Sequence, residues 1–113
     1  MSEPYVPDVG DLVWLDFDPR AGHEQSGRRP AIVLTPRVYN EAASLAIVCP
    51  VTRQVKGYPF EVVLPVGSAF EGSILADHVK SIDWQARRAE YQGKATASVL
   101  DEVHERLRAL LSL

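Results

Sequence analysis

The sequence has little cysteine, no long apolar run and no excess of positive charge. Its single cysteine, Cys49, and its three histidines are too few for a structural zinc site. No apolar segment approaches the roughly 20 residues of a membrane span, so no membrane contact is expected. The chain has 12 basic and 15 acidic residues and a net charge of −3. Any nucleic-acid contact must therefore use a local basic patch.

Two features bear on the cellular location. Residues 1–10 contain Glu3 and Asp8 and no apolar core, so they do not resemble a signal peptide. Cys49 lies in an apolar segment, which is typical of a buried thiol in a reducing compartment. We therefore expect a cytoplasmic protein.

Apolar residues are abundant by contrast. They make up 46% of the 113 residues, and eight prolines are spread among them. This combination is typical of a compact, turn-rich globule and argues against disorder. A chain of this length has room for one modest core, and no repeat or linker divides it. We expect a single domain over residues 1–113.

The polar chemistry is concentrated between two apolar segments, residues 12–17 and 31–34. The stretch between them has two glycines and a set of functional side chains from His23, Glu24, Gln25, Arg28 and Arg29. Strands that hold the ends of such a loop allow it to present polar groups to a ligand. Pro30 disfavours helical geometry at the residue before it, so we expect Arg29 to be extended at a strand edge.

Two short motifs in this loop are incomplete. Gly22 and Gly27 have the spacing of a nucleotide-binding phosphate loop, but arginines replace the required Lys and Ser or Thr, and a strand follows instead of a helix. His23 and Glu24 match the start of a zinc protease motif, but Gly27 occupies the second histidine position. We therefore predict no triphosphate site, no metal and no cofactor.

The remaining pattern predicts many short strands and one terminal helix. Strands are expected at residues 12–17, 30–35, 45–51, 60–64, 73–79, 80–84 and 89–91, with a helical turn at 37–43. An amphipathic helix begins near Ser98, which is the expected cap with Asp101 in the capping box, and Glu102 and Arg106 are spaced to pair. The fold class is thus mainly β with helices, in a small, strongly bent antiparallel β-barrel.

Several segments together resemble the MazF/PemK toxins, the RNA-cleaving halves of bacterial toxin–antitoxin pairs. The matching segments cover nearly the whole chain and are residues 5–19, 22–30, 50–63 and 75–84. The resemblance implies an SH3-like barrel that works as a homodimer and cuts single-stranded RNA, chiefly mRNA, without a metal. It also implies a cognate MazE-like antitoxin that blocks the RNA-binding surface.

The resemblance also implies site residues. Metal-free cleavage by the 2′-hydroxyl needs a base, an acid and fixed positive charge, and yields a 2′,3′-cyclic phosphate and a 5′-hydroxyl. Arg29 matches the family's catalytic arginine, and stabilising the phosphorane suits its high pKa better than acting as an acid. Thr52 matches the catalytic threonine, whose hydroxyl donates to the same phosphate.

Three further residues keep two interpretations each. Glu24 is nominated as the base or a positioning group, or it is a loop carboxylate that pairs with a neighbouring arginine. His23 orients the phosphate or stacks on a base, or it is a plain loop histidine. Asp77 aligns with a family base but lacks the arginine two positions earlier, where Leu75 stands, so RNA positioning or a structural hydrogen bond is favoured.

The remaining candidates would contact RNA. Gln25, Arg53, Lys56 and Lys80 are expected along the phosphate backbone or bases, with Arg28 and Arg87 as further cations. Phe17 and Tyr58 can stack on splayed bases, whereas Trp14 is assigned to core or dimer packing. Two other functions stay open. The same barrel also occurs in toxins that poison DNA gyrase without cleaving RNA, and a catalytically silent RNA-binding protein could have the same fold.

Overall fold

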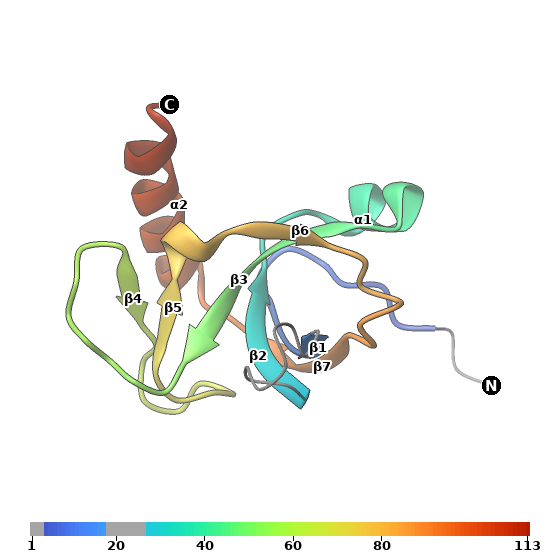
Figure 1. Ribbon diagram of the computed structural model, residues 1–113, viewed down its shortest axis with the longest axis horizontal. Helices are drawn as coiled ribbons and strands as arrows, with labels where there is room; N and C mark the ends of the chain where they lie inside the picture. Colours follow the sequence, from blue (N-terminus) through green and yellow to red (C-terminus); the bar gives the residue numbers. More distant parts are fainter. Residues whose placement is uncertain (1–3, 18–26) are drawn as a thin grey trace.

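Antiparallel strands make up most of the computed structural model, which describes residues 4–17 and 27–113 (Figure 1). The elements of the described part are β1 (Asp11–Phe17), β2 (Gly27–Val33), α1 (Arg37–Ala43), β3 (Ala46–Thr52), β4 (Glu61–Val63), β5 (Ser73–Leu75), the 3-10 turn η1 (Ala76–His78), β6 (Lys80–Ile82), β7 (Glu90–Lys94) and α2 (Ala97–Leu111). The predicted mainly antiparallel β fold with a carboxy-terminal helix is confirmed. In the described part of the chain, no helix combines the length and apolar character needed to cross a membrane.

Strand β3 is the centre of the sheet. The strands follow the order β4-β5-β3-β2-β1-β7, and β6 also pairs with β3. One edge of β3 pairs with β2, while the other pairs with β6 near Ala46 and with β5 near Thr52. Because β3 bridges these partners, the sheet bends around it, and its last residues lie where several segments meet (Figure 1).

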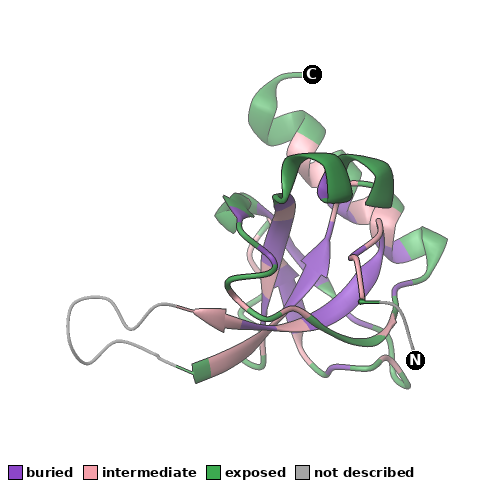
Figure 2. Cartoon of the chain, turned by 90° about the vertical axis from the view of Figure 1, so that its right-hand side faces the viewer, coloured by how far each residue is buried: buried purple, intermediate pink, exposed green. Residues whose placement is uncertain are grey.

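The core has two parts because β1 is buried on both faces. Leu12 packs with Val99 and Val103 of α2 on one face, and Leu15 packs with Trp84 on the other. Such alternation is what a strand with a side-chain period of two produces when both faces are covered. The purple strands in Figure 2 show this buried centre, from which β1 and β2 extend outward. Cys49 is also buried, as predicted, and burial raises the pKa of its thiol to about 12.

The terminal helix begins earlier than predicted. Thr96 is its cap, because the Thr96 hydroxyl accepts a hydrogen bond from the Val99 N–H at 3.2 Å. The Ser98 cap and the Asp101 capping box are therefore wrong, since the chain already turns into the helix at Ala97. The predicted pair is confirmed, with Arg106 Nη1 3.9 Å from a Glu102 carboxylate oxygen.

The strand predicted at residues 73–79 is broken by η1. Along β3, Val48 and Val51 are three positions apart, but their partners Lys80 and Ile74 are six positions apart. The extra residues between β5 and β6 cannot pair with β3, and they include the 3-10 turn η1. Other bounds shift at their ends: residues 60–64 and 80–84 form shorter strands, while the strand expected at 89–91 continues to Lys94.

Asn40 anchors α1 to the sheet from a fully buried position. Its Nδ2 donates to the Pro7 carbonyl at 2.8 Å and the Thr35 carbonyl at 2.9 Å, and its Oδ1 accepts from the Thr35 hydroxyl at 2.6 Å. A buried polar group left without a partner costs about 1–3 kcal/mol.

We expect Asn40→Ala to lower the free energy of unfolding by about 3 kcal/mol, because it strips partners from buried carbonyls. Urea titration followed by circular dichroism measures this. Glu41→Ala, at the exposed next position, is the control and should change stability by less than about 0.5 kcal/mol. Equal midpoints for both variants would contradict the anchoring role.

Candidate active site

The site opens where β2 and β3 separate. The ladder between them ends at the pair Ala31 and Pro50, because Pro30 has no N–H to continue it. Pro30 is nevertheless inside β2, which begins at Gly27 instead of the predicted residue 30, and it pairs with Trp14 of β1. Counting the β2–β3 register on by two residues places Arg29 opposite Thr52. Two residues far apart in sequence thus lie on the two strands that border the gap, and both line the cavity there.

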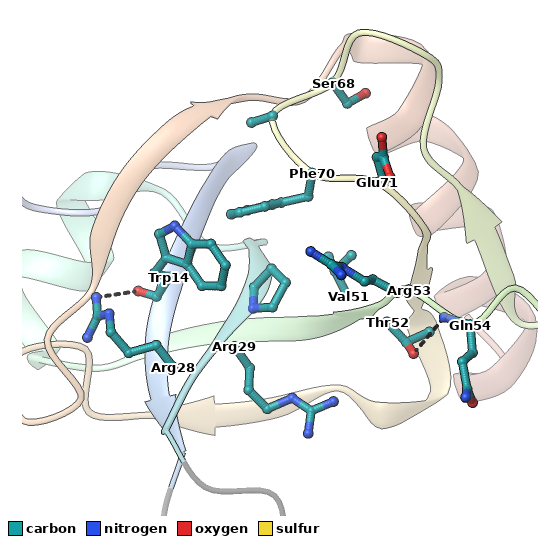
Figure 3. A pocket seen from close by; sticks show the side chains of 12 residues that line it. Trp14, Arg28, Arg29, Val51, Thr52, Arg53, Gln54, Ser68, Phe70 and Glu71 are labelled. Carbon is teal, nitrogen blue, oxygen red and sulfur yellow. Dashed lines mark hydrogen bonds between the residues drawn. The ribbon is translucent and has the colours of Figure 1, made fainter.

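A cavity of about 850 Å³ lies at this gap (Figure 3). Its lining comes from β1, β2, the end of β3 and the segment 68–71, and includes Trp14, Arg29, Thr52, Arg53, Phe70 and Glu71. Volumes of roughly 300–1,000 Å³ are typical of pockets that hold small organic ligands. The cavity therefore has the size for a nucleotide-sized group.

The two adjacent arginines of β2 have different surroundings. Arg28 Nη1 donates to Asp16 at 2.8 Å, and its Nη2 donates to the Arg88 carbonyl at 2.6 Å. Arg88 Nε also donates to Asp16 at 2.6 Å, and this bond, ahead of that from Arg28, holds the pKa of the Asp16 carboxyl below its usual value. Arg28 is thus occupied within the protein. Arg29 makes no hydrogen bond or ion pair with any described residue, so its guanidinium is available to a ligand.

Thr52 and Arg53 complete the polar side of the cavity. The Thr52 hydroxyl oxygen accepts the Gln54 N–H at 3.2 Å, which leaves its proton free to donate (Figure 3). Guanidinium groups match the geometry of phosphate oxygens, and a hydroxyl can add a further donor. Between them, Arg29, Thr52 and Arg53 can hold a phosphate ester and stabilise negative charge on it. Within the described ranges, no three His, Cys, Asp or Glu side chains lie together as metal ligands would.

The other predicted residues lie elsewhere or outside the described part. Phe17, Lys56, Tyr58, Asp77 and Lys80 do not line this cavity. Lys80 Nζ lies 4.9 Å from the centre of the Phe17 ring, a cation–π contact between the ends of β1 and β6. His23, Glu24 and Gln25 lie outside the described residues.

Tyr58 and Asp77 bind each other. The Tyr58 hydroxyl donates to Asp77 Oδ1 at 2.6 Å, and this hydrogen bond raises the pKa of Tyr58 to about 12. The bond joins the segment after β3 to η1, so Asp77 makes a structural hydrogen bond, one of the two interpretations that its sequence context favoured. The Asp77 carboxylate therefore already accepts a hydrogen bond from the neutral Tyr58 phenol.

Sequence reasoning missed Trp14, Phe70 and Glu71 as cavity residues. The sequence pattern assigns Trp14 to packing, and Phe70 and Glu71 fall between the strands expected at 60–64 and 73–79. No local signal marks them, because the path of the segment between β4 and β5 brings them to the cavity. A lone aromatic in a turn of glycine, serine and alanine was the one available hint.

Glu61 anchors the segment between β3 and β4, which follows Thr52 in the chain. Its buried carboxylate accepts the Gly57 N–H at 2.7 Å and the Lys56 N–H at 2.9 and 3.1 Å. The bond from Lys56, followed by that from Gly57, lowers the pKa of the Glu61 carboxyl. Because the folded pKa lies below the unfolded value, this anchoring is present above the unfolded pKa and is lost as the pH falls through the folded one.

We expect Glu61→Gln to speed hydrogen exchange of the Lys56 and Gly57 amides by roughly tenfold or more, because an amide accepts less strongly than a carboxylate. NMR or mass spectrometry at matched pH measures this. Glu41→Gln on exposed α1 is the matched control and should leave both amides protected. Unchanged exchange in Glu61→Gln would show that the carboxylate does not hold this segment.

The fold and the cavity together define a class: a small antiparallel β protein with a cavity whose arginines and threonine have the chemistry to hold a phosphate ester. Comparison with known proteins narrows this class. Residues 8–111 match the family of PemK-like, MazF-like toxins of type II toxin–antitoxin systems. The chain belongs to this MazF/PemK family.

Individual relatives agree with this family. The chain is 48% identical over 111 residues to the endoribonuclease toxin MazF of Escherichia coli K12, covering 98% of this chain and 99% of the relative. The crystal structure of MazF from Deinococcus radiodurans is 55% identical, with a TM-score of 0.89 over 97% of this chain and all of that one. MazF in a MazE–MazF crystal structure from the same organism is 55% identical, with a TM-score of 0.92 over 97% of this chain and 99% of that one.

Proposed function

We propose that this toxin is a sequence-specific endoribonuclease that cuts single-stranded mRNA without a metal. The observation that carries the proposal is the placement of Arg29 opposite Thr52, beside Arg53, in one open cavity. The relatives named as endoribonucleases support the same reaction class. Cutting mRNA would stop translation and growth.

The reaction follows from what the cavity can stabilise. The RNA 2′-hydroxyl loses its proton to a base, its oxygen bonds to the adjacent phosphorus, and the bond to the 5′-oxygen breaks as that oxygen takes a proton. The products are a 2′,3′-cyclic phosphate and a 5′-hydroxyl. Arg29 would stabilise the phosphorane and Thr52 would donate to its oxygens. Glu24 is nominated as the base or as a positioning group.

Two protein partners belong to the proposal. A second copy of the chain would form a homodimer, and a MazE-like antitoxin would neutralise it by covering the RNA-binding surface. The MazE–MazF crystal structures of the Deinococcus relative support the antitoxin partner. An acidic, partly disordered segment is the physical expectation for a partner that competes with RNA at Arg29 and Arg53.

The test is to incubate the purified protein with a long single-stranded RNA in EDTA and map the fragment ends. Discrete cuts that carry cyclic phosphate and 5′-hydroxyl ends would support the proposal and reveal the recognition sequence. Uncut RNA at excess protein would overturn it, and a gyrase inhibition assay would then test the other toxin activity known for this fold. RNA bound but uncut would indicate the silent binding barrel.

A further inference from the structure

An aromatic wall shares the cavity with Arg29 and Thr52. The rings of Trp14 and Phe70 meet edge to face, with centroids 5.1 Å apart and planes at 77° (Figure 3). Phe70 is 8% exposed and packs in the core cluster with Val51, whereas Trp14 stays partly exposed. The core therefore holds the wall rigid, while part of the indole remains open to the cavity.

Two polar groups beside this wall have no partner in the described part of the chain. The indole N–H of Trp14 donates no hydrogen bond there, and the exposed Glu71 carboxylate makes no hydrogen bond or ion pair. An indole N–H can only donate and a carboxylate can only accept. The cavity therefore offers an apolar aromatic surface, one free donor and one free acceptor, and its lining also includes Arg29 and Arg53.

We propose that this wall binds the base of one nucleotide next to the scissile phosphate, and that Glu71 selects a base with an exocyclic amino group. The proposal rests on the proposed function for the position of the phosphate. A nucleotide pairs an anionic phosphate with a flat aromatic base, as the cavity pairs Arg29 and Arg53 with Trp14 and Phe70.

The selection follows from hydrogen-bond chemistry. Adenine and cytosine carry an exocyclic amino group that can donate a hydrogen bond, which suits the acceptor oxygens of the Glu71 carboxylate. Uracil presents a carbonyl oxygen where those bases present the amino group, so it would face Glu71 with acceptor against acceptor. Uracil should therefore bind this cavity less well than adenine or cytosine.

The first experiment uses 2′-deoxy oligonucleotides of about eight nucleotides, which cannot be cut because they lack the attacking hydroxyl. Homopolymers of dA, dC and dU are titrated into the protein, and quenching of tryptophan fluorescence reports binding. We expect dA and dC to bind more tightly than dU. Phe70→Leu should weaken binding of all three roughly tenfold, and Glu71→Gln should reduce the preference over dU roughly three- to tenfold.

The matched controls are Phe60→Leu and Glu41→Gln, the same substitutions at residues outside the cavity lining. Both should bind all three oligonucleotides like the unmodified protein. Phe70 belongs to the core, so Phe70→Leu can also lower stability, and its melting temperature is measured first. Exposed Glu71→Gln tests base selection without this complication.

A parallel measurement maps cut sites on long RNA for the same variants. We expect Glu71→Gln to admit uracil at one position of the recognition sequence where the unmodified protein disfavours it. Equal oligonucleotide affinities and identical cut sites in Phe70→Leu, Glu71→Gln and their controls would overturn the inference. An unmodified protein that prefers dA and dC over dU yet cuts no RNA would overturn the proposed nuclease instead.

Discussion

Arg29→Ala is expected to lower the rate of RNA cleavage by roughly 10²–10³-fold, the typical loss when one preorganised donor to a developing charge is removed. Arg29 has no partner among the described residues, so the substitution leaves no buried group unpaired, and stability should change little. Cleavage of a mapped RNA site under single-turnover conditions measures the loss. Arg29→Lys should recover part of the rate, because it restores the charge without the planar fork.

The control for this loss is Arg37→Ala, an exposed arginine on α1 outside the cavity lining. It should cut at the unmodified rate. Thr52 offers an independent check, since Thr52→Val removes the hydroxyl at nearly constant volume while Thr52→Ser retains it. A slow Val variant beside a fast Ser variant would support the donor role, whereas full activity in Arg29→Ala would show that the cavity is not the catalytic site.

Gly72→Ala is expected to destabilise the protein by at least about 4 kcal/mol or to prevent folding. A Cβ at this position would lie 1.9 Å from the Thr52 carbonyl oxygen and 2.9 Å from Arg53 Cα, and Gly72 has a φ of +118°. Both contacts are with backbone atoms, which no side-chain rotation can relieve. The strand edge that positions Thr52 must therefore move if the chain folds.

Gly67→Ala separates this clash from the cost of the backbone conformation. Gly67 also has a positive φ, +93°, but a Cβ there would meet nothing within 4 Å. The Gly67→Ala substitution should therefore lower the free energy of unfolding by about 1 kcal/mol, because a residue with a Cβ is strained in a left-handed conformation. Thermal and urea unfolding of both variants measure the difference. Similar losses at both glycines would mean that close packing against Thr52 is not what requires Gly72.

Sequence patterns predicted most of the fold because local rules governed it. The aromatic and branched residues at 12–17 and the apolar run at 45–51 predicted β1 and β3, and the amphipathic face around Val99 and Val103 predicted α2. The predictions were wrong where contacts between distant segments of the chain determine the local structure. Both Thr96 and Ser98 are competent caps by sequence, and the choice depends on where the chain leaves β7. The turn at Ala76–His78 exists because β5 and β6 share one edge of β3.

The candidate site divides in the same way. The sequence determined the mainly β fold and indicated Arg29 and Thr52. Strand patterns and family motifs both depend on residues that are close together in the sequence. Tertiary structure alone decided that Arg29 and Thr52 line one cavity, that Arg28 donates to Asp16, and that Phe70 joins Trp14 in the same cavity. The physical reason is that these contacts depend on the pairing of β2 with β1 and with β3 and on the path of residues 65–72, which bring separate segments of the chain together.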